Sequence, residues 1–269
     1  MKRFLTITTS VLMALAAFAT PVKSDEAAKG LGYIDEEDWN PTAADYIQDG
    51  LVAMWDGIEN AGYGEFAPDA TKWIDLVSGV PLVPVTASRM SVGPSYINVA
   101  NTGMRVDLPG ISDIFASHNF SFQVVLRSNS DSTVTTTAFC SAGGSRPGFT
   151  GANSASGLAK FGTLNAGAWD TGMNAGYGSI VSASYVAMPI SNDGTRVLLY
   201  KDSKRVGGIE REPDKFPLSS NRLSIGISAF NPQLTAVDMD YFSVRIYNRA
   251  LTPEEIRYNY LIDKMRFGL

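Results

Sequence analysis

The side chains best suited to binding chemistry lie between residues 165 and 178, a segment rich in glycine and asparagine. Trp169, Asp170, Asn174 and Tyr177 fall within nine residues of one another there. An exposed aromatic ring can stack on the face of a sugar, while amide and carboxylate groups form the hydrogen bonds that orient it. These four residues are predicted to bind a carbohydrate from a surface loop. The alternative is that Trp169 fills one end of the folded core.

Three aspartates, Asp75, Asp238 and Asp240, are candidate ligands for a metal ion. Because Ca²⁺ is bound by clustered oxygen atoms, these residues predict a structural calcium ion. The alternative is that an aspartate in a turn accepts hydrogen bonds from nearby backbone N–H groups. A zinc site is not supported, because His118 is the only histidine and Cys140 the only cysteine.

Catalytic side chains are scarce in this sequence. His118 is the only candidate base for a nucleophilic triad, and no Gly-x-Ser-x-Gly motif accompanies it. A glycoside hydrolase needs two carboxylates about 5–10 Å apart across one cleft. The acidic runs at residues 35–38 and 210–214 do not alternate with apolar residues, and Pro213 would break a central strand. Both runs are predicted to be solvated loops, so no catalytic residue is assigned and no enzymatic activity is expected.

Residues 1–24 have the features of a secretory signal peptide. Lys2 and Arg3 precede a short apolar stretch that ends in small residues, and cleavage after Ala19 or Ser24 fits the pattern. The apolar stretch is short for a membrane-spanning helix, which needs about 20 residues. The protein is therefore expected to be exported, either secreted or kept in the periplasm or at the cell surface, without membrane insertion.

Charge and length restrict the remaining possibilities. Loss of residues 1–24 changes the formal charge from −5 to −8, because three basic and no acidic residues are removed. Such an acidic chain is a poor partner for nucleic acid or an anionic membrane. Residues 25–49 are acidic and weakly periodic, which predicts a loosely packed lead-in segment. Residues 50–269 are long enough for one all-β domain.

Short apolar runs separated by glycine, proline, asparagine and serine fill residues 50–247, a pattern typical of strands and turns. The expected strands span residues 51–55, 80–85, 96–99, 104–108, 120–127, 135–140, 158–163, 180–188, 196–201, 222–228 and 237–247. Residues 143–157 and 165–178 are expected to be loops, and little helix is expected before residue 252. The predicted fold is all-β, a two-sheet antiparallel jelly-roll sandwich with a short C-terminal helix.

The end of the chain carries the strongest local signals. Phe242, Val244 and Ile246 alternate with polar residues, which predicts a half-buried strand. The opposite parity of residues 237–241 predicts a β-bulge near Tyr241. Thr252, Pro253 and Glu255 predict a helix start with a capping box. The apolar side of this helix is expected to carry Ile256, Tyr260, Leu261 and Met265.

Several of these segments together resemble a known family. Residues 244–256 read VRIYNRALTPEEI, residues 50–64 read GLVAMWDGIENAGYG, residues 73–79 read WIDLVSG and residues 120–128 read FSFQVVLRS. They resemble laminin-G-like domains, which belong to the concanavalin A-like lectin/glucanase superfamily. The resemblance covers residues 50–268 and implies the same sandwich fold.

Two positions depart from the family pattern. Tyr241 and Phe242 stand where the family commonly carries Ile-Asp, and related sandwiches use such an aspartate for calcium. Asp238 or Asp240 could take over this role, because a hard cation needs clustered oxygens more than a fixed register. Asp202 and Ser203 replace the family's Asp-Gly turn, which predicts a longer or differently shaped turn.

The sequence therefore predicts an exported, non-catalytic binding module that recognises a glycan or another extracellular surface through aromatic residues in loops. The alternative is a structural or adhesion protein that binds an extracellular or cell-surface protein. A glycoside hydrolase is the least favoured alternative.

Overall fold

The computed structural model describes residues 39–60, 64–65, 69–100, 102–129, 136–142, 150–154, 158–162, 164–165, 168–169, 178–190, 194–211, 222–225 and 238–269. Between residues 136 and 169 it describes the backbone only. The chain divides into residues 1–40 and a compact unit of residues 41–269, to which the following description applies. The predicted signal peptide and the acidic run at 35–38 lie outside the described residues. In the part of the chain that is described, no helix is long and apolar enough to cross a membrane.

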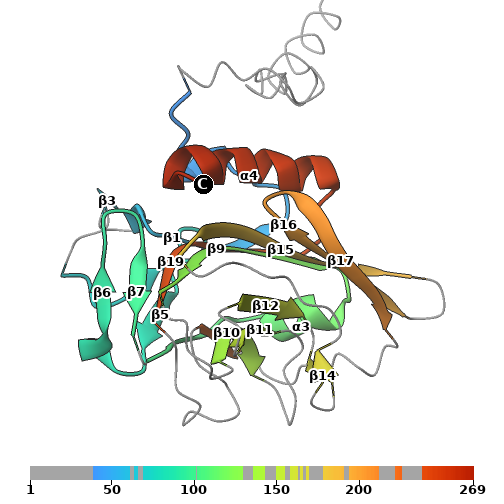
Figure 1. Ribbon diagram of the computed structural model, residues 1–269, viewed down its shortest axis with the longest axis horizontal. Coiled ribbons are helices and arrows are strands. Elements are labelled where there is room, and N and C mark those ends of the chain that lie inside the picture. The colour runs from blue at the N-terminus through green and yellow to red at the C-terminus, as the bar shows by residue number, and fades with distance from the viewer. Residues whose placement is uncertain are drawn as a thin grey trace, which may run out of the picture. The chain divides into compact units, whose positions relative to one another are not determined.

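One layer of the compact unit is an eight-stranded sheet (Figure 1). In spatial order it contains β17 (Lys204–Arg211), β16 (Thr195–Lys201), β15 (Ile180–Pro189), β9 (Phe120–Ser128), β19 (Met239–Tyr247), β7 (Ile97–Val99) and β6 (Met90–Val92), and β1 (Leu51–Asp56) also pairs with β19. Its neighbouring strands are antiparallel.

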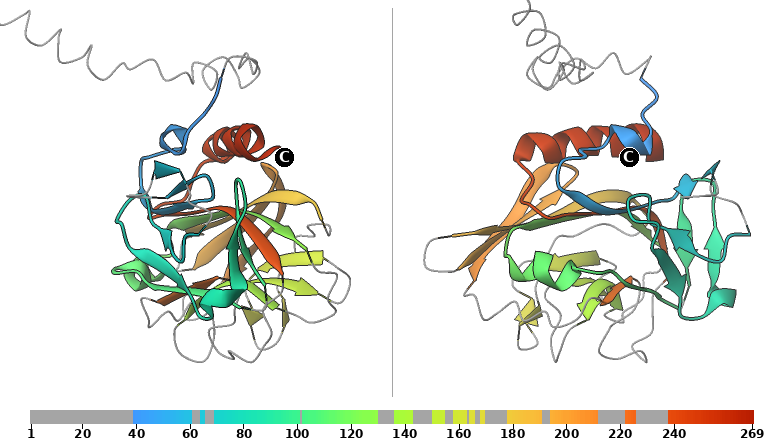
Figure 2. Two further views of the ribbon diagram at one scale, coloured as in Figure 1. Left: turned by 90° about the vertical axis from the view of Figure 1, so that its left-hand side faces the viewer. Right: turned by 180° about the vertical axis from the view of Figure 1, so that it is seen from behind.

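The second layer is a seven-stranded antiparallel sheet that faces the first (Figures 1 and 2). Its order is β12 (Leu158–Gly162), β11 (Thr150–Ser154), β10 (Thr136–Ala142), β18 (Arg222–Ile225), β8 (Met104–Asp107), β5 (Pro81–Pro84) and β4 (Trp73–Ile74). Two short hairpins accompany the sheets, β2 (Glu59–Asn60) with β3 (Gly64–Glu65) and β13 (Leu164–Asn165) with β14 (Ala168–Trp169). The predicted two-sheet all-β sandwich is confirmed.

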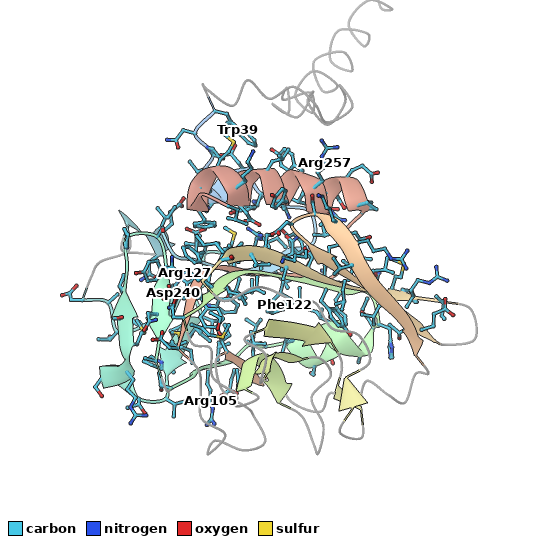
Figure 3. The ribbon with its side chains drawn as sticks, in the orientation of Figure 1. Trp39, Arg105, Phe122, Arg127, Asp240 and Arg257 are labelled. Atoms are coloured by element: carbon cyan, nitrogen blue, oxygen red, sulfur yellow. The ribbon has the colours of Figure 1, made fainter. Side chains whose placement is uncertain are left out.

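The core lies between the two sheets. On β9, Phe120, Phe122, Val124 and Leu126 all point into it, as their alternation predicts. Figure 3 shows Phe122 in this space. Trp55 and Trp73 are also fully buried. Removal of this apolar surface from water is the main favourable contribution to the stability of the sandwich.

In the part of the chain that the structure describes, helices are short except at the C-terminus. The structure contains the 3₁₀ turns η1 (Ala43–Asp45) and η2 (Ala87–Arg89), the helix α3 (Ile111–Ala116) and the C-terminal helix α4 (Pro253–Phe267). The sequence analysis missed α3, β17 and β11, the last of which falls in an expected loop. Residues 42–49 pack more tightly than expected of a lead-in, because Tyr46 is buried and the backbone N–H of Ile47 bonds to Asn259.

The strand β19 is buried along its whole length, so the prediction of a half-buried strand is wrong. One face packs into the core, and α4 covers the other (Figure 1). The predicted bulge is confirmed, since the register with β9 shifts between Tyr241 and Ser243. The shift lets Met239 and Tyr241 share the core with Val244 despite their opposite parity.

The hairpin between β16 and β17 corrects another prediction. Asp202 and Ser203 form a two-residue turn with φ values of 48° and 62°. Positive φ at both positions is the geometry of the tight hairpin turns that match strand twist. Asp202 tolerates this geometry, and its carboxylate accepts a hydrogen bond from the backbone of Ser182. The turn is therefore short and has the geometry that Asp-Gly favours, so the prediction of a longer or differently shaped turn is wrong.

The start of α4 agrees with the sequence. The Thr252 side chain accepts from the backbone N–H of Glu255, whose carboxylate accepts from the backbone N–H of Thr252. The buried side of the helix differs from the prediction. It carries Ile256, Asn259, Ile262, Asp263 and Phe267, whereas the expected apolar residues 260, 261 and 265 are half-buried. Because Asn259 and Asp263 on the buried side are polar, the spacing of apolar residues predicted the wrong side of the helix.

Replacing Thr252 by Ala removes the helix cap and is expected to lower the free energy of unfolding by about 1 kcal/mol. Urea unfolding followed by circular dichroism measures the change. Thr86→Ala is the matched control, because Thr86 precedes η2 but makes no side-chain capping bond. Equal losses in the two variants would contradict the assigned cap.

Candidate binding site

The outer face of the eight-stranded sheet is closed by a buried ion pair. Both side chains of Arg245 on β19 and Asp263 on α4 are 0% exposed, and their N–O distances are 2.7 and 2.9 Å. Asp263 also accepts hydrogen bonds from the Tyr46 hydroxyl at 2.8 Å and the Ser182 hydroxyl at 2.7 Å. Burial lowers the pKa of the Arg245 guanidinium, but the charge of Asp263, its hydrogen bonds to Arg245 and the nearby Tyr46 and Tyr247 together raise the pKa above its usual value.

A second set of hydrogen bonds lies beside this pair. The Asn259 side-chain amide donates to Gln123 at 2.7 Å and to the Tyr247 hydroxyl at 3.0 Å, and Gln123 donates to Ser184 at 2.8 Å. Burial raises the pKa of Tyr247 to about 12, so its hydroxyl stays neutral at physiological pH. The buried side chains under α4 are therefore hydrogen-bonded to one another and do not present a surface to a ligand.

A third contact fixes the end of α4. Arg266 forms two bonds of 2.7 and 2.9 Å with Asp56, which also accepts from the backbone N–H groups of Ile58 and Glu59. Burial raises the pKa of Asp56, and the charge of Arg266 opposes this shift. Together with Asp263 and Asn259, this contact holds both ends of α4 against the sheet.

The outer face of the seven-stranded sheet is different, because it carries a hollow. On β8, Met104 and Val106 point into the core, so the intervening Arg105 points outward. Arg105 pairs with Val83 on β5, which is 44% exposed. The hollow has a volume of about 420 Å³ and is lined by Val80, Pro81, Val83, Arg105, Val106 and Asp107. Figure 3 shows Arg105 on the side of the structure away from α4.

Among the described residues, two buried polar atoms at this face have no hydrogen-bond partner. One is the Nε atom of Arg105, and the other is the hydroxyl of Ser224 on β18. Ser224 lies directly opposite Arg105 in the sheet, and its neighbours Leu223 and Ile225 point into the core. Ser224 therefore shares the outward face with Arg105, although its side chain is 0% exposed. Within the described residues, no carboxylate forms a salt bridge with Arg105.

The residues predicted to bind carbohydrate are only partly described. Trp169 lies in β14, where its backbone pairs with Leu164, and its side chain is outside the described part. Asp170, Asn174 and Tyr177 also lie outside the described residues. In Figure 1, β14 lies on the side of the eight-stranded sheet opposite α4 and away from β5. The ligand-binding role of these four residues stays a prediction.

Of the predicted calcium ligands, Asp75 has a clear local role. Its buried carboxylate accepts from the backbone N–H groups of Met54 at 2.6 Å, Val77 at 3.1 Å and Ser78 at 2.9 Å. This is the alternative arrangement that a turn aspartate suggests. The hydrogen bonds join β1 to the turn that follows β4.

Asp238 and Asp240 lie together at the start of β19. The Asn98 amide donates to Asp238 at 2.6 Å and to Asp240 at 2.8 Å, and Arg127 forms an ion pair with Asp240 (Figure 3). In the described part of the chain, no three His, Cys, Asp or Glu side chains are grouped closely enough to hold a metal ion. The structural calcium ion stays a prediction.

Neither candidate for catalysis gains support from its surroundings. His118 adopts a left-handed backbone conformation before β9, and its ring contacts the Thr195 hydroxyl. Glu210 lies in β17, not in the expected loop, and its exposed side chain pairs with Arg196. The contact between His118 and Thr195 lies at the turn before β9. The pair between Glu210 and Arg196 is an exposed interaction between neighbouring strands.

Comparison with protein-family models and with curated proteins finds no match. Solved structures do share the fold. A Trypanosoma rangeli sialidase in complex with sialic acid has a TM-score of 0.62 at 15% identity, over 84% of this chain and 34% of that one. A botulinum neurotoxin type C structure has a TM-score of 0.58 at 10% identity, over 79% and 51%. The binding domain of botulinum neurotoxin DC, in complex with rat synaptotagmin II, has a TM-score of 0.58 at 11% identity, again over 79% and 51%.

At these identities the comparisons establish the fold alone, which is an all-β sandwich. The chain spans about a third of the sialidase and about half of the neurotoxin chains. It therefore corresponds to a part of each of these larger proteins.

Replacing Asp263 by Asn leaves the Arg245 charge buried without its partner. The free energy of unfolding is expected to fall by about 3–5 kcal/mol, as is typical when one member of a buried pair is removed. Guanidinium unfolding measures the loss. Glu210→Gln, which breaks the exposed pair with Arg196, is expected to change stability by at most about 1 kcal/mol. A comparably small effect of Asp263→Asn would show that the buried pair is unimportant for stability.

Proposed function

We propose that this protein is an exported, non-catalytic binding module that recognises a glycan on an extracellular surface. The observation that carries the proposal is the difference between the two outer faces of the sandwich. One face is closed by α4, whereas the other offers a hollow with an unpaired cation and apolar walls. Small-molecule sites are typically concave and mostly apolar, with a few placed polar groups, and measure about 300–1,000 Å³.

The solved structures give independent support for a binding role. The sialidase of similar fold is bound to sialic acid. Cell entry of the botulinum neurotoxin type C depends upon interaction with two ganglioside molecules. These ligands belong to those proteins, but they show that carbohydrate recognition occurs among proteins that contain this fold.

The lining of the hollow favours binding over hydrolysis. Asp107 is the only carboxylate among the described residues that line it, whereas glycoside hydrolysis needs two carboxylates on opposite sides of the scissile bond. We therefore include the absence of glycosidase activity in the proposal. We also propose that the protein is a member of the laminin-G-like family and that residues 1–24 direct its export.

A protein-binding role is the second candidate. It is favoured by the exposed side chains of Val77, Val83 and Val85, which lie in or beside β5 and the turn before it. Exposed apolar side chains that gather on one region of a surface often mark an interface between proteins. The neurotoxin binding domain in complex with synaptotagmin II provides a parallel for a protein partner.

The proposed function is tested by binding of the purified protein to a broad glycan array, with calcium and with a chelator. Reproducible binding to a defined set of glycans is expected, without release of free sugar over hours of incubation. Trp169→Ala distinguishes binding in the hollow from binding at the alternative site, the residues around Trp169 that the sequence predicts to bind carbohydrate. Absence of binding to any glycan, combined with capture of a defined cell-surface protein, would support the adhesion role instead.

A further inference from the structure

Within the described residues, the cation in the hollow forms no salt bridge, although Asp107 also lines the hollow. Arg105 is half-buried, and its Nε atom is shielded from water without a hydrogen-bond partner. A buried donor without a partner is unfavourable, and more so when the group is charged. The Nε atom of Arg245 also lacks a partner, but the guanidinium of Arg245 is ion-paired with Asp263. Arg105 has no such pair in the described part of the chain and is available for an anionic ligand.

Ser224 does not belong to this site. It lies opposite Arg105 in the sheet, but its side chain is 0% exposed and it is not among the described residues that line the hollow. A ligand in the hollow therefore reaches Arg105 and not Ser224.

We propose that the hollow binds the carboxylate of one acidic sugar residue within a glycan. The Arg105 guanidinium donates two parallel hydrogen bonds to the carboxylate oxygens. Val83 and Pro81 pack against the C–H face of the sugar ring. This assignment rests on the proposed function and specifies the chemical class of its ligand.

The surroundings of the hollow favour a single acidic sugar over a polyanion. The whole chain is acidic, with a formal charge of −5, and repels a densely charged polymer at long range. One arginine can still select a single carboxylate at short range, because the planar guanidinium matches carboxylate geometry. The volume of about 420 Å³ also suits one sugar unit better than an extended peptide.

The test is calorimetric titration of the protein with sialyllactose and with a glucuronate-terminated disaccharide. Each probe is compared with its carboxyl-reduced form, which keeps the sugar ring but not the charge. The acidic form of at least one probe is expected to bind at least tenfold more tightly than its reduced form. Arg105→Gln is expected to weaken that binding at least tenfold, since charge-assisted bonds to a carboxylate are lost.

Arg196→Gln is the matched control, because it removes the same charge from an exposed side chain on β16, in the other sheet. Its affinity is expected to equal that of the unmodified protein. Arg105→Lys keeps the charge but lacks the planar fork, so its affinity is expected to fall as well.

The outcomes separate this inference from the proposed function. Glycan binding that is indifferent to the carboxylate and to Arg105 would overturn the inference and leave the proposed function intact. Failure to bind any glycan on the array would overturn both. Arg105-dependent binding of an acidic peptide, without binding of acidic sugars, would assign the site to a protein ligand and overturn the ligand class. The comparison of acidic and reduced probes needs no variant, so it decides the question even if Arg105→Gln fails to fold.

Discussion

The buried ion pair between Arg245 and Asp263 is the contact on which the arrangement of this sandwich depends. A helix usually docks on a sheet through apolar side chains, but here a charged pair, with Tyr46 and Ser182 bonded to it, lies at the centre of the interface. The Arg245 guanidinium also lies 3.9 Å from the centre of the Tyr46 ring. Such a pair stabilises only when its geometry is complete, because both charges lose their hydration. Any shift of α4 along the sheet would break several bonds at once, so the pair fixes the register of the helix.

This docking decides which surfaces remain for function. Where α4 and residues 42–49 pack over the eight-stranded sheet, the outer face contains buried polar groups that a ligand cannot reach. The seven-stranded sheet lacks such a cover over β5 and β8, where the side chains of Pro81, Val83 and Asp107 are exposed. The same sandwich thus has a structural face and a face that is open to partners.

Much of the architecture follows from the sequence because its signals are local. The capping box at Thr252 and the parity change at Tyr241 each involve a few adjacent residues, and both predictions are confirmed. The buried side of α4 could not be predicted from apolar spacing, because Asn259 and Asp263 are polar. Their burial depends on hydrogen bonds to Gln123 and Ser182, which are distant in sequence.

The candidate site shows the same limit more sharply. The alternation of Met104, Arg105, Val106 and Asp107 does predict a strand with a polar face, and this was the signal available for Arg105. No sequence pattern, however, indicates that Ser224 lies opposite it, because the pairing of β8 with β18 brings together residues 119 positions apart. Among the described residues, the Nε atoms of both Arg245 and Arg105 lack a hydrogen-bond partner. The two arginines differ in their ion pairs, because the guanidinium of Arg245 is paired with Asp263 under α4, whereas Arg105 has no salt bridge and lies at an open hollow. The missing ion pair, together with the position at a hollow, is therefore what makes Arg105 a candidate for binding an anionic ligand.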